Sequence, residues 1–187
     1  MDRYNNLDIK SSYHSNNLGE DLYNFVLENK PNTIIEFGIL NGYSLISMAL
    51  ALKKLGNGKI IAYDLFEEYN YNKPDTIKLL ENIKKYEVLE YIELKKGSLF
   101  DWFTSPEEFD LMHVDVSNDG DVILQLYNNI KKYLDKGSIL LFEGGSQERD
   151  EVHWMKKYNK TPINDIKPII NYKLLTEKFP SISYVKS

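Results

Sequence analysis

Apolar residues along the chain follow two spacings, one typical of buried strands and one typical of helices. Short, nearly continuous apolar runs predict five strands, at residues 33–37, 59–64, 91–97, 109–115 and 137–145. Apolar residues recur every three or four positions in the segments around them, which predicts helices at residues 17–29, 44–55, 75–86 and 123–134. Because strand and helix alternate without a linker or a repeat, the order predicts a doubly wound α/β fold.

The pattern changes after Glu143. Residues 149–158 have the spacing of a helix, and residues 171–177 and 181–186 read as two strands around the turn KFPS. A connection this short cannot hold a crossover helix, so the pair is predicted to be antiparallel. The sequence therefore predicts one domain, residues 1–187, with a Rossmann-like, mostly parallel sheet of about seven strands and a C-terminal antiparallel hairpin.

Composition and charge narrow the classes of partner. With 23 Lys and Arg against 28 Asp and Glu, the net charge of −5 offers no basic field to nucleic acid. No apolar run is long enough to span a bilayer, and the polar start lacks the apolar core of a signal peptide. The absence of cysteine excludes a disulfide framework and a thiolate zinc site. We expect a cytoplasmic enzyme or binding protein without nucleic-acid or membrane partners; its oligomeric state, a homodimer included, stays open.

Carboxylates stand at the ends of four of the five predicted parallel strands. These are Glu36, Asp64, Asp115 and Glu143. In an open α/β sheet, ligands bind outside the carboxyl ends of the strands. Four unpaired carboxylates inside a sheet would each cost several kcal/mol, so we expect them to line a polar cleft.

Two glycines, Gly38 and Gly42, lie in the turn after the first strand, in the stretch EFGILNGYS. They do not make the G-x-G-x-x-G pattern of a dinucleotide site, because Leu40 stands where the backbone would have to approach a pyrophosphate. Asp64, at the end of the second strand, can accept hydrogen bonds from a ribose diol and repels a 2′-phosphate. Asp64 thus argues against NADP but not against NAD.

Several stretches together resemble one known family, from about residue 17 to residue 145. EFGILNGYS resembles the E-x-G-x-x-x-G-Y-S donor-binding motif of class I S-adenosylmethionine-dependent methyltransferases, in the subgroup of small-molecule O-methyltransferases related to catechol O-methyltransferase. AYDLFE, KGS, FDLMHVD and LDKGSILLFEGG resemble the later motifs, in the same order and spacing. The resemblance implies an enzyme that moves a methyl group from S-adenosylmethionine to an oxygen of a small-molecule acceptor, such as a sugar or a hydroxylated metabolite.

The resemblance also implies a donor site. Its residues here would be Glu36, Gly38, Gly42, Tyr43, Ser44, Asp64, Gly97, Ser98 and Asp115. Free N–H groups at the helix start near Tyr43 and Ser44 can receive the carboxylate of the donor. Alternative roles are open for three of them: Glu36 as a strand-end residue that accepts from backbone N–H groups, Ser44 as a helix N-cap, and Asp64 as an incidental loop carboxylate. Asn17, with Glu20, is expected only to cap the first helix through a capping box.

Asp115 and Glu143 are the candidates for the chemistry. Carboxylates at the ends of adjacent parallel strands can hold a hard cation such as Mg²⁺. In the family the third metal ligand corresponds to Gly144, which has no side chain, and the lysine base corresponds to Asn118, which cannot take a proton. Three interpretations therefore stay open: Asp115 and Glu143 bind Mg²⁺, one of them is a general base, or they only line the cleft with polar groups.

Histidine supplies one further catalytic candidate. His153 follows the fifth strand and can overhang the acceptor with Trp154 and Arg149, whereas His113, deeper in the fourth strand, is expected to be a core residue. Arg149 either holds an anionic or sugar-like acceptor or is a solvated surface residue. Asp119 and Asp121 are expected to cap and charge a helix start rather than to touch a ligand.

Two rival functions accompany the methyltransferase hypothesis. A non-catalytic S-adenosylmethionine-binding protein would keep Asp64 but lose turnover. An NAD-dependent oxidoreductase would need the glycine pattern that is absent here.

Overall fold

The protein is described by a computed structural model that covers residues 4–68 and 75–186. The chain divides into two compact units, Met1–Glu107 and Glu108–Ser187, each with its own set of internal contacts. The two units are described separately. The expectation of one domain therefore stays a prediction.

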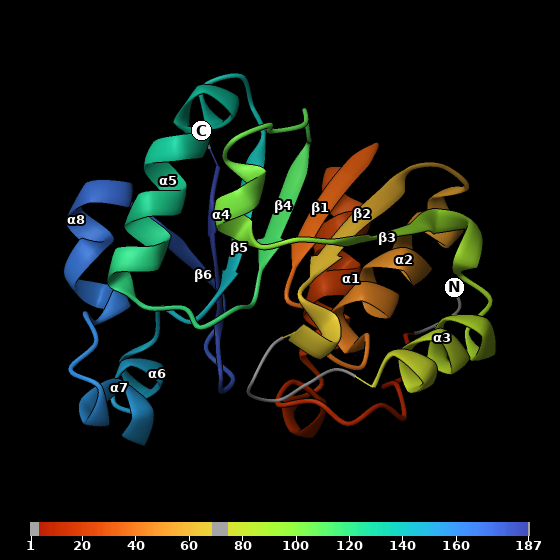
Figure 1. Cartoon of the computed structure of the whole chain (residues 1–187), viewed down its shortest axis with the longest axis horizontal. Helices are drawn as coiled ribbons and strands as arrows, with labels where there is room; N and C mark the ends of the chain where they lie inside the picture. Colours follow the sequence, from red (N-terminus) through yellow and green to blue (C-terminus); the bar gives the residue numbers. More distant parts are fainter. Residues whose placement is uncertain (1–3, 69–74, 187) are drawn as a thin grey trace. The chain divides into compact units, whose positions relative to one another are not determined.

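The first unit is built on three parallel strands in the order β3-β2-β1 (Figure 1). They are β1 (Thr33–Phe37), β2 (Lys59–Asp64) and β3 (Ile92–Lys96). In β1 every residue after Thr33 is buried, because helices cover this apolar strand and water cannot reach it. Burying an Ile or Leu side chain fully contributes about 1.5–3 kcal/mol, so the strands anchor the unit.

Helices connect and cover these strands, and α1 packs against α2. The helical segments are η1 (His14–Asn16), α1 (Leu18–Asn29), α2 (Tyr43–Leu55), η2 (Phe66–Glu68), α3 (Thr76–Lys85), η3 (Leu89–Tyr91) and α4 (Leu99–Trp102). Leu22, Val26, Leu45 and Leu52 are all fully buried on α1 and α2. This apolar packing fixes the start of α2, and with it the glycine turn, against the end of β1.

The start of α1 differs from the predicted capping box. Asn17 is the N-cap, but its φ of 53° is left-handed and its side chain accepts no hydrogen bond from the helix. Instead its Nδ2 donates to Oε2 of Glu20 at 2.9 Å. The left-handed backbone turns the amide away from the helix N–H groups, so the capping box prediction is wrong and a side-chain pair replaces it.

The second unit has four strands in the order β4-β5-β7-β6. They are β4 (Leu111–Val114), β5 (Ile139–Glu143), β6 (Lys173–Thr176) and β7 (Ile182–Val185). β4 and β5 are parallel, whereas β7 is antiparallel to both β5 and β6. The predicted C-terminal hairpin is therefore confirmed.

The helices of the second unit are α5 (Gly120–Leu134), α6 (Gln147–Asp150), α7 (His153–Lys157), η4 (Ile163–Ile166) and α8 (Lys167–Ile170). The single helix predicted at residues 149–158 is thus two short helices. They are separated at Val152, whose ψ of 151° is extended and cannot continue a helix.

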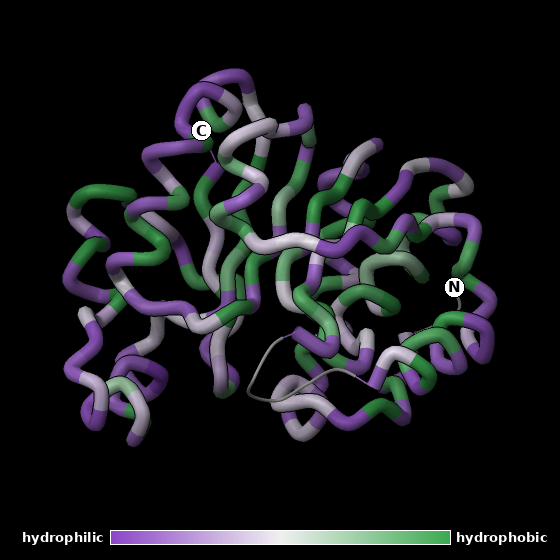
Figure 2. The backbone as a smooth tube through the Cα atoms, viewed as in Figure 1, coloured by the Kyte–Doolittle hydropathy of each residue, from purple (hydrophilic) through white to green (hydrophobic). Residues whose placement is uncertain are grey.

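Across the described residues, the seven strands give the mixed, mostly parallel Rossmann-like α/β fold that the sequence predicts. Figure 2 shows the strands mostly in the hydrophobic colour, while α3 and α5 alternate between hydrophobic and hydrophilic residues. Such helices bury one face and expose the other. Within the described ranges, none of the helices has both the length and the apolar character needed to cross a membrane.

Candidate functional site

The glycine turn of the first unit has an unusual backbone. Gly38, Leu40 and Gly42 have φ values of 86°, 48° and 89°, all left-handed. Glycine adopts such values freely, but a residue with a Cβ loses about 1–2 kcal/mol there. Leu40 is therefore held in this conformation by its surroundings, and a strained residue at a strand end is typical of a functional loop.

Asp64 is the residue that holds this loop. Its Oδ2 accepts hydrogen bonds from the backbone N–H groups of Ile39 at 2.8 Å and Leu40 at 3.4 Å. Its Oδ1 accepts from the N–H of Phe66 at 2.8 Å. Left-handed residues turn backbone N–H groups toward one side and make an anion-binding concavity, here filled by the carboxylate of Asp64. A carboxylate offers about four acceptor positions, so Asp64 keeps capacity for a ligand hydroxyl.

Glu36 and Ser44 hold each other beneath the loop. The Ser44 hydroxyl donates to Oε1 of Glu36 at 2.5 Å, and both residues are buried. The N-cap of α2 is Gly42, so the interpretation of Ser44 as an N-cap is wrong. A hydrogen bond to a carboxylate contributes about 1.5–3 kcal/mol, and this one ties the start of α2 to the end of β1.

Tyr43 uses its side chain for a different purpose. Its hydroxyl donates to Oδ1 of Asn6 at 2.5 Å, and its ring meets Tyr13 edge-on with 6.4 Å between centroids. Burial raises the pKa of Tyr43. Asn41, two residues before Tyr43, donates from Nδ2 to the carbonyl of Lys10 at 3.2 Å. The N-terminal segment therefore packs on the glycine turn, and Tyr43 can offer a ligand its backbone N–H rather than its hydroxyl.

The turn after β3 lies beside the end of β2. The N–H of Gly97 donates to the carbonyl of Asp64 at 3.1 Å. Ser98 is the N-cap of α4, where it forms a capping box with Asp101. Hydrogen bonds from the side chain and backbone of Ser98 lower the pKa of Asp101. The side chain of Ser98 is thus engaged in capping, and the part of this turn placed next to Asp64 is backbone.

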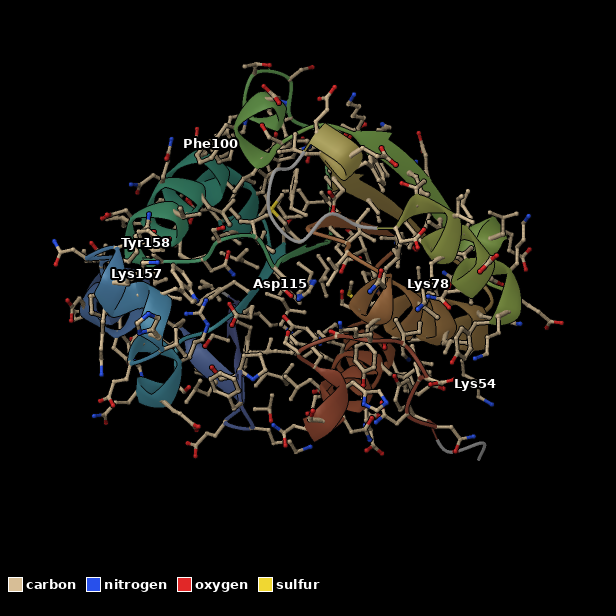
Figure 3. The ribbon with its side chains drawn as sticks, turned by 60° about the horizontal axis from the view of Figure 1, so that its bottom comes forward. Lys54, Lys78, Phe100, Asp115, Lys157 and Tyr158 are labelled. Carbon is tan, nitrogen blue, oxygen red and sulfur yellow. The ribbon has the colours of Figure 1, made fainter. Side chains whose placement is uncertain are left out.

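In the second unit, Asp115 and Glu143 follow paired strands. Val114 lies opposite Phe142 in the parallel register of β4 and β5, so the two carboxylates come next, one at the end of each strand. Asp115 is half-buried and Glu143 is buried. Figure 3 shows Asp115 well apart from Tyr158, which follows the end of α7. The predicted pairing of these strand ends is therefore present.

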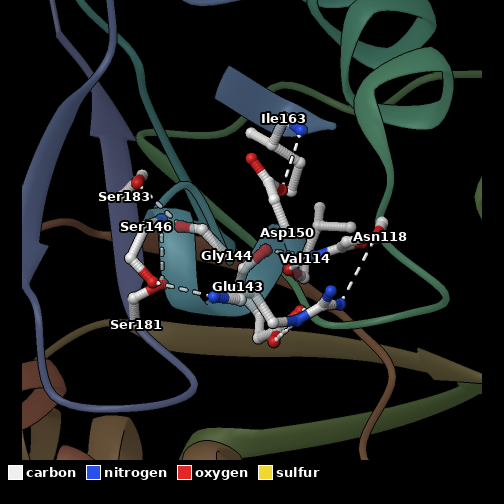
Figure 4. Close-up of polar contacts among 10 residues, drawn as sticks. Val114, Asn118, Glu143, Gly144, Ser146, Asp150, Ile163, Ser181 and Ser183 are labelled. Carbon is white, nitrogen blue, oxygen red and sulfur yellow. Dashed lines mark hydrogen bonds and ion pairs between the residues drawn. The ribbon is translucent and has the colours of Figure 1, made fainter. Parts of the chain in front are cut away.

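Glu143 has a partner that the sequence did not assign to it. Nε of Arg149 donates to Oε1 of Glu143, and Nη2 donates to Oε2 at 2.8 Å (Figure 4). Nη2 also donates to the carbonyl of Asn118 at 3.3 Å. Arg149 is 4% exposed, and its guanidinium lies 4.9 Å from the ring centroid of Trp154. This is a buried, two-point ion pair, so the interpretation of Arg149 as a solvated surface residue is wrong.

The protonation of Glu143 is set by opposing effects. Burial and the nearby Asp115 carboxylate raise the pKa of Glu143 above its usual range, whereas the hydrogen bonds and charge of Arg149 act in the other direction. Removing a carboxylate from water disfavours its charged form, whereas the two-point contact with the Arg149 guanidinium favours it. Because Arg149 contacts both oxygens of Glu143, Glu143 is poorly placed to take a proton from a substrate.

Asn118 and the acidic residues after it are structural. Nδ2 of Asn118 donates to the carbonyls of Val114 and Glu143, both at 2.9 Å, which ties the end of β4 to the end of β5. Asp119 caps α5 by accepting from the N–H of Val122 at 3.0 Å, and Asp121 accepts from the Thr161 hydroxyl at 3.0 Å. The expected cap at Asp119 and the expected charge of Asp121 in the first turn of α5 are confirmed.

The two histidines of this unit differ in environment. His113 is fully buried within β4, as expected of a core residue. His153 is exposed in the first turn of α7, and none of the described contacts joins it to Asp115 or Glu143. Trp154, the next residue, covers Arg149 instead. A catalytic role for His153 stays a prediction.

With this geometry in view, comparison with known proteins identifies the family. A sequence model described as a methyltransferase domain matches residues 35–143, more than half of the 187 residues. The chain belongs to this methyltransferase family. Membership confirms the resemblance to class I S-adenosylmethionine-dependent methyltransferases, and the prediction that the protein is an enzyme. The match contains both the left-handed turn at Gly38–Gly42 and the paired strand ends at Asp115 and Glu143.

Three solved structures illustrate the fold of the methyltransferase. An O-methyltransferase from Streptomyces achromogenes involved in tomaymycin synthesis, solved with S-adenosylmethionine, has a TM-score of 0.65 and 15% identity, over 91% of this chain and 80% of that one. An O-methyltransferase from Bacillus cereus, with S-adenosylhomocysteine, has a TM-score of 0.65 and 17% identity, over 91% and 81%. A methyltransferase from Podospora anserina, bound to S-adenosylhomocysteine, has a TM-score of 0.62 and 16% identity, over 94% and 79%. No curated protein sequence matches.

Sequence reasoning missed the pairing of Arg149 with Glu143 in the methyltransferase. One signal was present: Arg149 is one of only two arginines in a chain that otherwise uses lysine. Arginine offers a planar fork that matches a carboxylate, which lysine does not. The rare arginine six residues after the strand-end carboxylate was therefore a signal, in the sequence, of a two-point ion pair.

Proposed function

We propose that the chain transfers the methyl group of S-adenosylmethionine to an oxygen of a small-molecule acceptor, such as a sugar or a hydroxylated metabolite. The observation that carries this proposal is the position of Asp64 at the end of β2, inside the left-handed loop of a methyltransferase-family chain. Its one remaining acceptor position suits a hydroxyl of the ribose. The donor carries no phosphate, so its binding requires no second glycine at Leu40.

The methionine end of the donor would bind at the start of α2. The first-turn N–H groups of a helix attract a carboxylate through hydrogen bonds and the helix dipole. Tyr43 and Ser44 supply such N–H groups, and the Ser44–Glu36 hydrogen bond fixes their direction. In this account Glu36 is a positioning residue. The N–H groups of Ile39 and Leu40 instead serve Asp64.

The reaction would be an in-line displacement. The acceptor oxygen attacks the methyl carbon, the carbon–sulfur bond breaks, and its electron pair neutralises the sulfonium. Alignment of donor and acceptor supplies most of the rate. The proton of the acceptor hydroxyl leaves to a base, for which we propose Asp115, because both oxygens of Glu143 contact Arg149. His153 is the second candidate for this proton.

The relatives with similar folds support the donor and the acceptor atom. Two are O-methyltransferases solved with S-adenosylmethionine or S-adenosylhomocysteine. The chemical class of the acceptor rests on our proposal alone. The cytoplasmic location and the lack of nucleic-acid and membrane partners also stay predictions, and the oligomeric state stays open.

Calorimetric titration with S-adenosylmethionine, S-adenosylhomocysteine, NAD and NADP tests the donor. We expect the first two to bind and the nucleotides not to bind. Binding of NAD alone would replace the proposal with the oxidoreductase alternative. Transfer of a labelled methyl group to members of a panel of sugars and phenols, with the label recovered as a methyl ether, would then separate the enzyme from a non-catalytic binding protein.

A further inference from the structure

The strand ends of β4 and β5 do not fit the divalent cation that the family resemblance implies. Magnesium takes oxygen ligands in a near-octahedral shell and needs carboxylate oxygens that face the ion. Of the three residues that correspond to metal ligands, Glu143 already has both oxygens in contact with the Arg149 guanidinium. A divalent ion at Glu143 would lie next to a fixed positive charge, which opposes its binding.

Gly144 offers no replacement ligand. Gly144 has no side chain that could bind a metal. Its φ of 106° is unfavourable for any residue with a Cβ, and an added Cβ would lie only 2.6 Å from Cδ1 of Ile163. Its carbonyl accepts from the Ser183 hydroxyl at 2.7 Å, and its N–H donates to the carbonyl of Ser181 at 3.0 Å. In residues 4–68 and 75–186, no group of three or more His, Cys, Asp or Glu side chains is placed to hold a metal.

Arg149 is built into this position rather than attached to its surface. It lies in α6, whose N-cap Ser146 accepts from the Arg149 N–H at 3.3 Å. Asn118 accepts from its Nη2 on one side, and Trp154 lies against the guanidinium. A buried cation with this many contacts cannot leave to admit an ion without exposing an uncompensated carboxylate.

We propose that the guanidinium of Arg149 takes the place of the divalent cation beside Glu143, so that this methyltransferase works without a metal. The proposal deepens the proposed methyl transfer and rests on it for its functional part. Its structural part, the closure of Glu143 to metal ions, stands independently. Arg149 acts through Glu143 and is thus a positioning residue.

The direct test is Mn²⁺ binding, followed by paramagnetic resonance, with the wild-type chain and with Glu143→Gln. Mn²⁺ prefers the same oxygen ligands as Mg²⁺ and is visible on its own. We expect no saturable binding in the wild type up to millimolar free ion, and the same weak background in Glu143→Gln. Saturable wild-type binding that Glu143→Gln removes would overturn the proposal.

Variants of Arg149 add a second measurement, the effect of Mn²⁺ on the melting temperature. This effect would not differ between the variants if Arg149 had only a structural role. Arg149→Met removes the charge and frees Glu143, so we expect a lower melting temperature that Mn²⁺ partly restores. Arg149→Lys keeps the charge but loses the two-point contact, and it should show no Mn²⁺ rescue. Equal rescue in both, or stabilisation of the wild type by Mn²⁺, would count against the proposal. The wild-type titration decides the question even where Arg149→Met does not fold.

A third test measures methyl transfer in the absence of free metal ions. Once an acceptor is found, methyl transfer should be unchanged in excess chelator, and loss of activity that Mg²⁺ restores would overturn the proposal. Failure of the proposed function would instead appear as absent S-adenosylmethionine binding in metal-free buffer. The two failures are therefore distinguishable.

Discussion

At the scale of single residues, Asp64 combines two tasks at the end of β2. Its three backbone hydrogen bonds hold Ile39, Leu40 and Phe66 in place, and its one remaining acceptor position suits a ribose hydroxyl. The left-handed backbone of Leu40 persists because this carboxylate receives its N–H. The loop is therefore shaped before any ligand binds, which reduces the entropy that binding must overcome.

Replacement of Asp64 by asparagine tests this double role. Asp64→Asn keeps the shape but removes the charge and puts N–H donors where the loop needs an acceptor. We expect S-adenosylmethionine to bind more weakly by about 1.5–3 kcal/mol, the range for hydrogen bonds to a charged group. Calorimetric titration measures the change. Asp135→Asn, an exposed carboxylate paired with Lys131 in the second unit, is the control and should bind normally. Equal affinity in both variants would remove Asp64 from the donor site.

Gly145 illustrates a residue fixed by space as well as by backbone angle. Its φ is 100°, and an added Cβ would lie 2.3 Å from Oγ of Ser183, which is itself held by the carbonyl of Gly144. Gly137 has a similar φ of 102° but nothing within 4 Å. Both alanine variants lose about 1–2 kcal/mol from the backbone angle, and Gly145→Ala should lose about 1–3 kcal/mol more from overpacking. Urea unfolding compares them, and equal losses would contradict the steric account.

At the scale of elements, a cluster of three side chains connects β2 and β3 to the end of the first unit. Glu107 accepts from the Tyr63 hydroxyl at 2.5 Å and from Nζ of Lys95 at 2.7 Å. Burial and the hydrogen bond to Glu107 raise the pKa of Tyr63 to about 12. Partial burial alone would raise the pKa of Glu107, but the hydrogen bonds from Lys95 and Tyr63 hold it below its usual range. The cluster is most stable with Glu107 ionised.

The pH dependence of this cluster follows from the lowered pKa. The contribution of Glu107 is fully present above its unfolded pKa of about 4.3 and is lost as pH falls through the lower folded value. Glu107→Gln should therefore unfold more easily than the wild type at pH 7, by less than about 1 kcal/mol because the pair is partly exposed, with little difference at pH 3. Chemical unfolding at both pH values provides the measurement. A difference that grows in acid would contradict this sign.

The elements also show how far the sequence reaches. The bounds of β1 and β2 match the predicted residues 33–37 and 59–64, because an apolar run between turn residues is a local property. The division of residues 149–158 into α6 and α7 was not predicted, since it depends on the extended backbone of Val152. Such a break reflects packing in three dimensions rather than periodicity.

The candidate site divides along the same line. Strand-end positions such as Asp64 and Glu143 follow from the order of strands and were predicted. Their partners were not, because these depend on backbone angles that the sequence does not display, such as the φ of 48° at Leu40. The turn through Gly144 and Gly145, both left-handed, likewise brings Arg149 back to Glu143. A left-handed backbone can be predicted from the sequence at a glycine, which adopts positive φ freely, but not at a leucine.

At the scale of the whole molecule, the family match bears on the domain organisation. The methyltransferase domain spans residues 35–143 and so crosses from the first compact unit into the second, which begins at Glu108. A domain is expected to have one hydrophobic core and to unfold as one. Since the second unit holds only 80 residues of the chain, from Glu108 to Ser187, an independent core there would be small and only marginally stable.

Scanning calorimetry of the full chain tests whether the units unfold together. We expect one transition, with a calorimetric enthalpy equal to the van't Hoff enthalpy, as a single domain requires. A ligand that binds only the folded state stabilises it by about 2.7 kcal/mol at a concentration 100 times its dissociation constant. Because the turn at Gly38–Gly42, where we propose that the donor binds, lies in the first unit, S-adenosylmethionine should raise the whole transition only if unfolding of the second unit is coupled to that of the first. Two transitions, of which the donor moves one, would show that the units are separate domains and would contradict the expectation of a single domain over residues 1–187.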